Sequence, residues 1–294
     1  MSVRLGLALM WLLHFLPLRL LAAIGKIFGM MLYWLGRERR RVARINLRLC
    51  FPEMADGERE KLVRHHFRAF GRSVLERGIL WWSRPARIEH LVHIEGWENV
   101  APHLGKPLIL MVPHFVGLDV GWTRLTLERQ LASIYSKQKN PIFNQTLLRG
   151  RLRFNAPRLL SRQEGIRPVV KAVRDGLPLY YLPDMDYGPR DALFVPFFGV
   201  TAATITSLAR LANMTDARVV PCIVHQLSGG RGYAVRFYPL WENYPSEDVE
   251  ADTKRMNVFI EERVREMPEQ YFWLHKRFKT RPPGEPGIYK QIGL

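Results

Sequence analysis

The stretch Pro107-Leu-Ile-Leu-Met-Val-Pro-His-Phe-Val-Gly-Leu-Asp119 decides the fold of this 294-residue chain. Residues 108–112 form a short apolar run between two prolines, which is typical of a buried strand. Gly117 then opens a helical spacing of apolar residues. This order predicts His114 in the loop at the carboxyl end of a strand and Asp119 in the first turn of the next helix. Open α/β sheets bind their ligands at that edge.

His114 and Asp119 are candidates for a catalytic pair. A carboxylate can fix the tautomer of a histidine that acts as a base, and it can stabilise the imidazolium. The alternative is a loop histidine without a chemical role, next to an acid that only complements the positive end of a helix. The spacing of five residues is compatible with both interpretations, and only residues elsewhere in the chain distinguish them.

The charge of the chain points to an anionic partner. A formal net charge of +17 implies a negative partner surface, such as nucleic acid, anionic lipid, an acidic protein or a phosphorylated substrate. The hydrophobic fraction of 47% is sufficient for a large core. Cys50 and Cys222 form neither a CxxC pair nor a zinc spacing, which argues against a disulfide framework or a structural metal.

Residues 5–35 are predominantly apolar, with Pro17, Arg19 and Lys26 among the interruptions. They predict either one imperfect spanning helix or two amphipathic helices in the membrane interface, with the basic side chains reaching the headgroups. A buried helix of a soluble protein is the third interpretation, and the flanking Trp and Tyr residues favour a membrane over it. Six arginines follow directly, which predicts a cytoplasmic location for the remainder and attraction to anionic lipid: Arg37, Arg39, Arg40, Arg41, Arg44 and Arg48.

From about residue 89 the pattern alternates between strands and helices, which predicts an α/β fold with a mixed, largely parallel central sheet flanked by helices. We expect an N-terminal membrane anchor at 1–36, a basic helical juxtamembrane region at 37–88 and a catalytic domain at 89–294. The predicted strands are 90–94, 108–112, 132–135, 177–182, 217–224 and 233–237. The predicted helices are 117–129, 141–154, 163–175, 202–214 and 247–267.

Three arginines, Arg149, Arg151 and Arg153, gather at the end of the predicted helix that begins at residue 141. Cations complement the negative carboxyl end of a helix, which is one interpretation. Guanidinium groups also suit phosphate binding, which we favour. In a second segment, Asp184 follows the strand predicted at 177–182, on the same edge of the sheet as His114. The alternative interpretation is that acids in a turn rich in Pro and Gly only form the local hydrogen bonds of an Asx turn.

The motifs together resemble the bacterial lipid A secondary acyltransferases, the lauroyl and myristoyl family within the glycerolipid acyltransferase superfamily. The resemblance rests on the His114-x4-Asp119 pair, the region of Arg151 and Pro183-Asp-Met-Asp-Tyr-Gly188. It also rests on Val195-Pro-Phe-Phe-Gly199, Val219-Val-Pro221 and the ending 269–282. The resemblance covers nearly the whole chain. Many members have Glu where this chain has Asp119, which shortens the reach of the carboxylate by one methylene.

The resemblance implies an enzyme at the cytoplasmic face of a bacterial inner membrane that transfers a fatty acyl group from acidic acyl carrier protein to a hydroxyl of a lipid A precursor. His114 and Asp119 would form the catalytic pair, with His114 as the general base and Asp119 holding its imidazole. The implied substrate-binding residues are Arg151, with Gly150 beside it, Asp184, Arg149 and Arg153. We expect no metal or cofactor, because the thioester donor is already activated.

Two other functions are compatible with parts of the sequence. The same chemistry could act on a glycerolipid, a lysophospholipid or another membrane lipid. A basic nucleic-acid-binding protein would explain the net charge but not the apolar segment 5–35 or the placement of His114, and the sequence contains no recognised nucleic-acid motif.

Overall fold

The computed structural model of the chain describes residues 2–291. Four helices open it: α1 (Val3–Leu13), α2 (Leu18–Leu35), α3 (Arg37–Cys50) and α4 (Asp56–Trp82). Pro17 separates the first two, because a proline ends the preceding helix and its fixed φ suits a helix start. The apolar segment is therefore a pair of helices. Of the described helices, α2 alone is long and apolar enough to cross a bilayer by length and composition, and 33% of it is buried inside the protein.

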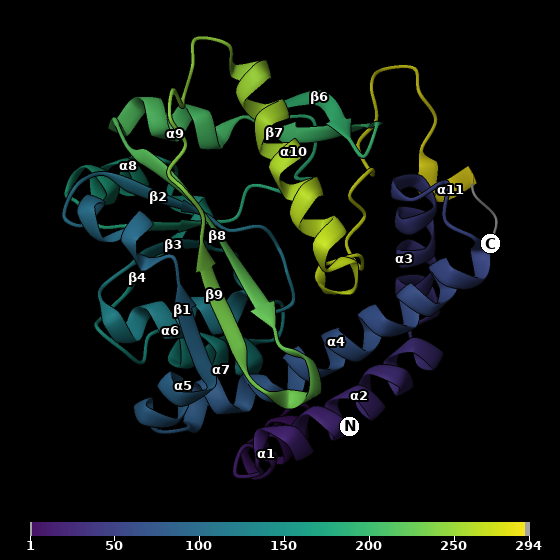
Figure 1. Cartoon of the computed structure of the whole chain (residues 1–294). Helices are drawn as coiled ribbons and strands as arrows, with labels where there is room; N and C mark the ends of the chain where they lie inside the picture. Colours follow the sequence, from purple (N-terminus) through teal and green to yellow (C-terminus); the bar gives the residue numbers. More distant parts are fainter. Residues whose placement is uncertain (1, 292–294) are drawn as a thin grey trace.

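A seven-stranded sheet forms the centre of the molecule, with the strand order β1-β9-β8-β2-β5-β3-β4 (Figure 1). The β8–β9 pair is antiparallel and the other neighbours are parallel, so the predicted mixed, largely parallel sheet is confirmed. The strands are β1 (Val92–Glu95), β2 (Leu108–Met111), β3 (Ala132–Tyr135), β4 (Arg158–Ser161), β5 (Leu179–Tyr181), β8 (Arg218–Gln226) and β9 (Tyr233–Phe237).

Helices cover both faces of this sheet. In β2, Leu108 and Leu110 belong to one hydrophobic core, and Ile109 and Met111 belong to the other, as expected for a strand buried on both sides. The first core includes residues of α1, α2, α6 (Leu118–Glu128) and α7 (Pro141–Arg151). The second includes residues of α3, α8 (Arg167–Arg174), α9 (Ser207–Thr215) and α10 (Val249–Glu266). Residues of the three ranges expected as separate regions thus share the same two cores.

The prediction of a helix at 202–214 is wrong in its first part. Residues Val200–Ile205 form strand β7, which pairs antiparallel with β6 (Ala192–Phe197) in a separate two-stranded sheet. Phe198 and Gly199 both have positive φ, 52° and 72°, which gives the two-residue turn that such a hairpin favours. The helix α9 begins only at Ser207. The sequence prediction also missed β4 and the short helices α5 (Pro85–Leu91) and α11 (Ile288–Gln291).

Candidate active site

His114 and Asp184 meet at the carboxyl edge of the sheet. Strands β2 and β5 are parallel neighbours with Met111 opposite Tyr181. His114 lies three residues after Met111, and Asp184 lies three residues after Tyr181. The Nδ1 atom of His114 lies 2.7 Å from Oδ1 of Asp184, and the backbone N–H of His114 donates to Oδ2 at 2.9 Å. One carboxylate therefore fixes both the backbone and the ring of His114.

The expected contact between His114 and Asp119 is wrong. Asp119 lies in the first turn of α6, and its carboxylate accepts hydrogen bonds from two arginines instead. The chain turns between His114 and α6, with hydrogen bonds from Leu118 N–H to Phe115 O and from Phe115 N–H to Pro113 O. The partner of the imidazole comes from the neighbouring strand. Asp184, for which the sequence suggested only a place at the substrate, takes this role.

Asp119 joins α6 to two other helices. Its Oδ1 accepts from Nε of Arg151 at 3.1 Å and from an Nη of the same side chain at 2.6 Å, while its Oδ2 lies 2.9 Å from an Nη of Arg77 on α4. Burial favours a raised pKa for this carboxyl, but the two guanidinium groups outweigh it and lower the pKa to about 2. Asp119 is therefore ionised, and two positive charges facing one negative charge leave the cluster with a net positive charge.

Burial also favours a raised pKa for Asp184, and the nearby His114 reverses this effect and lowers the pKa. The side chain of Asp184 is 1% exposed, whereas the side chain of His114 is 17% exposed. The other ring nitrogen of His114, Nε2, has no hydrogen-bond partner within residues 2–291. The pair thus consists of a buried acid and a partly exposed imidazole whose Nε2 has no hydrogen-bond partner among the described residues.

Arg151 is positioned by the packing of α7. Its carbonyl accepts from the indole N–H of Trp122 at 3.0 Å, which links α7 to α6. The neighbouring Gly150 is buried, and a Cβ there would lie 2.0 Å from Cδ1 of Trp81 on α4. Gly150 therefore permits the close approach of α7 and α4, and its predicted place at the substrate stays a prediction.

The other two arginines of the predicted phosphate site differ from Arg151. Arg153 donates from one Nη to the carbonyl of Leu80 and from the other to that of Ser83 at 2.7 Å. These carbonyls lie at the end of α4, so Arg153 complements the negative end of that helix, and its predicted role in phosphate binding stays a prediction. Arg149 is exposed on α7.

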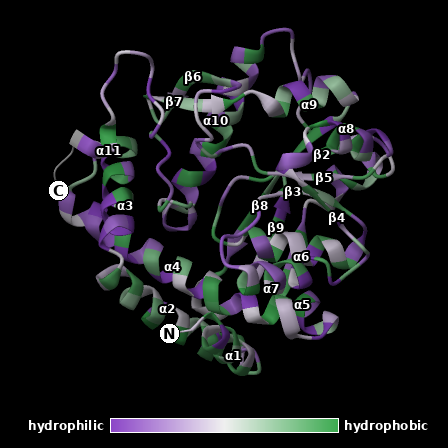
Figure 2. Ribbon diagram, turned by 180° about the vertical axis from the view of Figure 1, so that it is seen from behind, coloured by the Kyte–Doolittle hydropathy of each residue, from purple (hydrophilic) through white to green (hydrophobic). Residues whose placement is uncertain are grey.

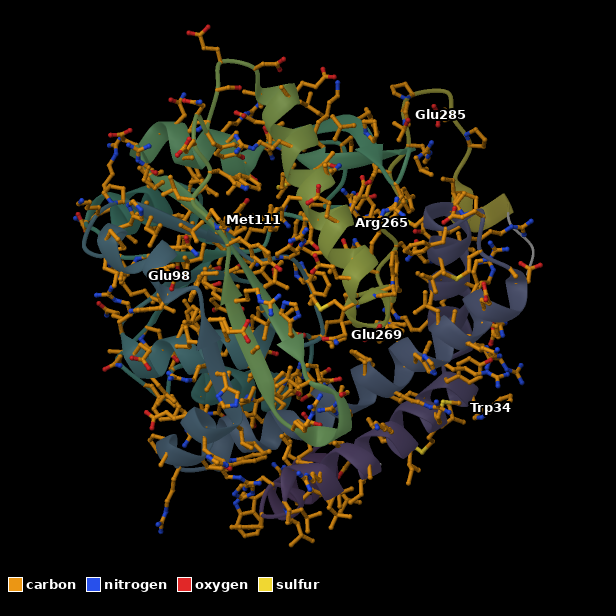
Figure 3. All side chains as sticks on the ribbon, viewed as in Figure 1. Trp34, Glu98, Met111, Arg265, Glu269 and Glu285 are labelled. Carbon is orange, nitrogen blue, oxygen red and sulfur yellow. The ribbon has the colours of Figure 1, made fainter. Side chains whose placement is uncertain are left out.

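A segment near the C-terminus forms one wall of the site. The N–H of Phe272 donates to the carbonyl of His114 at 2.9 Å, and the N–H of Val116 donates to the carbonyl of Gln270 at 2.9 Å. Phe115 and Tyr271 form an antiparallel bridge between these hydrogen bonds. The His114 loop is thus held between β5 and the ending of the chain. Figure 3 marks Met111, the last residue of β2, and Glu269, which precedes this segment.

Asp186 holds the same ending from another point. Its carboxylate accepts from the N–H and hydroxyl of Thr280, both at 2.7 Å, and from the N–H of Gly188 at 2.9 Å. Its own N–H donates to Nε2 of His275 at 3.0 Å. Asp186 is a structural neighbour of the pair and does not contact His114.

Sequence reasoning missed Arg77 and misassigned Asp184. For Asp184 a signal was present: Val112-Pro113-His114 and Leu182-Pro183-Asp184 repeat an apolar, Pro, polar order after two buried strands. Such a repeat predicts equal offsets at one sheet edge if the two strands are neighbours. Arg77 carried no comparable signal, because a single arginine on a long helix is indistinguishable from a solvated one.

The chain matches one protein family over most of its length. The family model described as bacterial lipid A biosynthesis acyltransferase matches residues 1–280. The chain belongs to this family. The resemblance found in the sequence is thereby confirmed.

Individual relatives match over most of their length. A lipid A biosynthesis lauroyltransferase of Escherichia coli (strain K12) is 34% identical over 288 residues, covering 97% of this chain and 94% of that protein. A lipid A biosynthesis myristoyltransferase of the same organism is 34% identical over 278 residues, covering 94% and 84%. The crystal structure of the 1-acyl-sn-glycerophosphate acyltransferase PlsC from Thermotoga maritima aligns with a TM-score of 0.41 and 15% identity, over 85% of this chain and 97% of that one.

Proposed function

We propose that this family member transfers a fatty acyl group from acyl carrier protein to a hydroxyl of a lipid A precursor, with His114 as the general base. The observation that carries the proposal is the 2.7 Å contact between Nδ1 of His114 and the buried Asp184, which leaves Nε2 available. Family membership supports the substrate class. An acyltransferase for a glycerolipid or lysophospholipid remains the second candidate, because the chemistry is the same.

In the proposed reaction, Nε2 of His114 removes the hydroxyl proton as the oxygen attacks the thioester carbonyl carbon. The C–S bond then breaks, the ester forms and the thiolate takes the proton back from the imidazolium. General base catalysis of this kind contributes about 10²–10⁴-fold. The thioester is an activated donor, so the proposed reaction requires neither a metal nor a cofactor.

Asp184 would act as the positioning residue. A carboxylate that accepts from Nδ1–H selects the tautomer with its lone pair on Nε2, and it stabilises the imidazolium formed during the reaction. The backbone N–H of Gly117, at the start of α6, has no acceptor in the part of the chain that the structure describes. It is a candidate donor to the oxyanion of the tetrahedral intermediate.

Asp119 would act through the arginines rather than through His114. It orients the guanidinium groups of Arg77 and Arg151, whose side chains are 22% and 24% exposed, and the cluster keeps a net positive charge. Paired guanidiniums suit a phosphate group, and a phosphorylated sugar is such a substrate. This role explains the need for an acid at position 119 without a direct contact to the imidazole.

The proposed donor is an acidic protein, and the surface of the chain suits one. An exposed groove of about 330 Å³ has apolar side chains from Ile166, Val170 and Met214 and a rim that includes Arg167 and Lys171. Together with the net charge of +17, this groove supports an acyl carrier protein as partner, through electrostatic steering. We place the enzyme at the cytoplasmic face of the inner membrane, anchored by its N-terminal helices.

The test is turnover by His114→Ala with a radiolabelled acyl carrier protein thioester. The variant should lose activity by at least 100-fold while it still binds membranes and the donor protein. Wild-type protein assayed against a lipid A precursor and a lysophospholipid separates the two acceptors. Full activity of His114→Ala would remove the general base from the proposal.

A further inference from the structure

The N-terminal helices present an unusual surface. Ten of the sixteen large hydrophobic side chains that are exposed in the described residues belong to α1, α2 and the turn between them. They include Trp11, Phe15, Ile27 (72% exposed) and Trp34, with Leu5, Leu9, Leu12, Leu20, Met31 and Leu35. Figure 2 shows α1 and α2 along one outer edge of the molecule, and in Figure 3 Trp34 projects from that edge. Such a concentration marks a contact surface.

The opposite face of α2 is locked to α4 by backbone contact. A Cβ on Gly71 of α4 would lie 2.4 Å from the Cα atom of Gly29, and one on Gly29 would lie 2.1 Å from the carbonyl oxygen of Phe67. A Cβ on Gly25 would lie 2.7 Å from the Cα of Arg72. The two helices run side by side (Figure 1), and only glycine at these positions allows their backbones to lie this close together.

This packing also covers buried charge. Arg72 and Glu76 of α4 form an ion pair at 2.8 Å with side-chain exposures of 4% and 2%. The hydroxyl of Tyr233 in β9 donates to the same glutamate, and Arg72 donates to the carbonyl of Leu227 at 3.1 Å. Because Gly25 lies directly against Arg72, removing α2 from α4 would uncover a buried ion pair and part of the first core.

An α2 that crossed a bilayer would therefore carry α4 with it. Helix α4 has exposed charged side chains, including Lys61 and Arg64, and it is joined to the sheet by Glu76. Placing these charges at the depth of the lipid chains is strongly unfavourable. Helix α2 has 18 residues and satisfies the length for spanning, but its attachment to α4 does not permit that orientation.

We infer that α1 and α2 lie flat in the membrane interface, with their exposed apolar face in the lipid and α4 above them on the cytoplasmic side. The inference rests on the proposed membrane location and specifies its geometry. Arg19 and Lys26 are exposed and seven residues apart, so they lie along one side of α2, beside the apolar stripe. Basic side chains in this position reach anionic headgroups while the stripe is buried.

This orientation brings the site to the lipid surface. Arg77 is on α4, the helix against which α2 packs. Residues of α1, α4 and α7 all belong to the first hydrophobic core. The positive cluster of Arg77 and Arg151 would then lie close to headgroup level, where a phosphorylated lipid presents its charge. An acceptor would reach His114 without leaving the bilayer completely.

Spin labels on α2 test the orientation. Leu20→Cys, Ile27→Cys and Trp34→Cys place labels seven residues apart on one face, and the native Cys50 and Cys222 are buried. The full chain is reconstituted in vesicles of phosphatidylethanolamine and phosphatidylglycerol, and label depth is measured from collisions with oxygen and with a water-soluble nickel chelate. Val258→Cys on α10, 53% exposed, is the water-exposed control.

A flat α2 predicts the same shallow depth at all three positions. A spanning α2 predicts a maximum at residue 27, about 10 Å deeper than the other two, since seven residues rise about 10 Å along a helix. That profile would overturn the inference and leave membrane anchoring intact. Three labels as accessible to the nickel chelate as the Val258→Cys label would overturn both. Acyl transfer by the same preparations reports separately on the proposed function.

Discussion

Replacing Asp184 by Asn distinguishes the two carboxylates of the site. Asparagine keeps the size of the side chain but replaces one of two accepting oxygens with an NH₂ group. In the wild-type protein both oxygens accept, at 2.7 Å from the ring and at 2.9 Å from the backbone of His114. Asp184→Asn therefore either leaves an N–H facing an N–H or selects the wrong tautomer, with the proton on Nε2.

The magnitude follows from the lost hydrogen bond and charge. A hydrogen bond to a charged group contributes about 1.5–3 kcal/mol, and the imidazolium also loses a buried counterion. We expect a loss of about 2–4 kcal/mol of transition-state stabilisation, which corresponds to a decrease in kcat/KM of roughly 30–1,000-fold. The pKa of Asp184 is lowered in the folded protein. Ionised Asp184 therefore contributes to the free energy of unfolding above the pKa of an unfolded carboxyl group, and this contribution is lost as the pH falls through the folded pKa.

The assay is steady-state acyl transfer across pH for Asp184→Asn, Asp119→Asn and the control Asp186→Asn. Asp184→Asn should lower kcat and alter the pH profile. Asp119→Asn should mainly raise KM for the phosphorylated acceptor and keep the wild-type profile. Asp186 is buried in the same loop but does not contact His114, so its variant reports on loop stability alone.

Non-additivity provides a second criterion. If Asp184 acts only through the imidazole, adding Asp184→Asn to His114→Ala should cost little more than His114→Ala alone. The reasoning would be refuted by an Asp184→Asn enzyme that keeps more than a third of wild-type kcat with an unchanged pH profile while Asp119→Asn loses turnover completely.

Three further predictions concern the supporting structure. Arg77→Ala should raise KM for the phosphorylated acceptor by about tenfold, as loss of one charge-assisted contact implies, with KM for the donor unchanged; steady-state assays beside Arg64→Ala on the exposed side of α4 check this. Gly150→Ala should destabilise the fold by about 1–3 kcal/mol through overlap with Trp81, whereas Gly57→Ala, which meets nothing within 4 Å, should not; thermal unfolding compares them. Burial lowers the pKa of His66 to about 4, so the unfolded state binds more protons than the folded state between pH about 6.5 and 4, and the free energy of unfolding falls on acidification by up to about 3 kcal/mol. Urea unfolding across this pH range should show a smaller decrease in the free energy of unfolding for His66→Gln than for the wild-type protein.

Much of the fold followed from local patterns. The strands at 132–135 and 233–237 have the predicted bounds, because each is a short, mostly apolar run, with Ser136 after the first and Gly232 before the second. The hairpin β6–β7 was missed because residues 200–205 also fit the start of a helix, and only pairing with 192–197 decides their conformation. Helix α2 likewise has the composition of a spanning helix, and the close contact with Gly71 is a property of the packed pair.

The sequence alone determined that His114 follows a buried strand, that a carboxylate begins the next helix, and that an apolar, basic-flanked segment opens the chain. Only the tertiary structure decided which acid serves the imidazole. Asp184 is 70 residues away, and its place beside His114 depends on β5 being the parallel neighbour of β2 in equal register. Strand order arises from the packing of the whole sheet and its covering helices, and spacing along the chain contains no information about it.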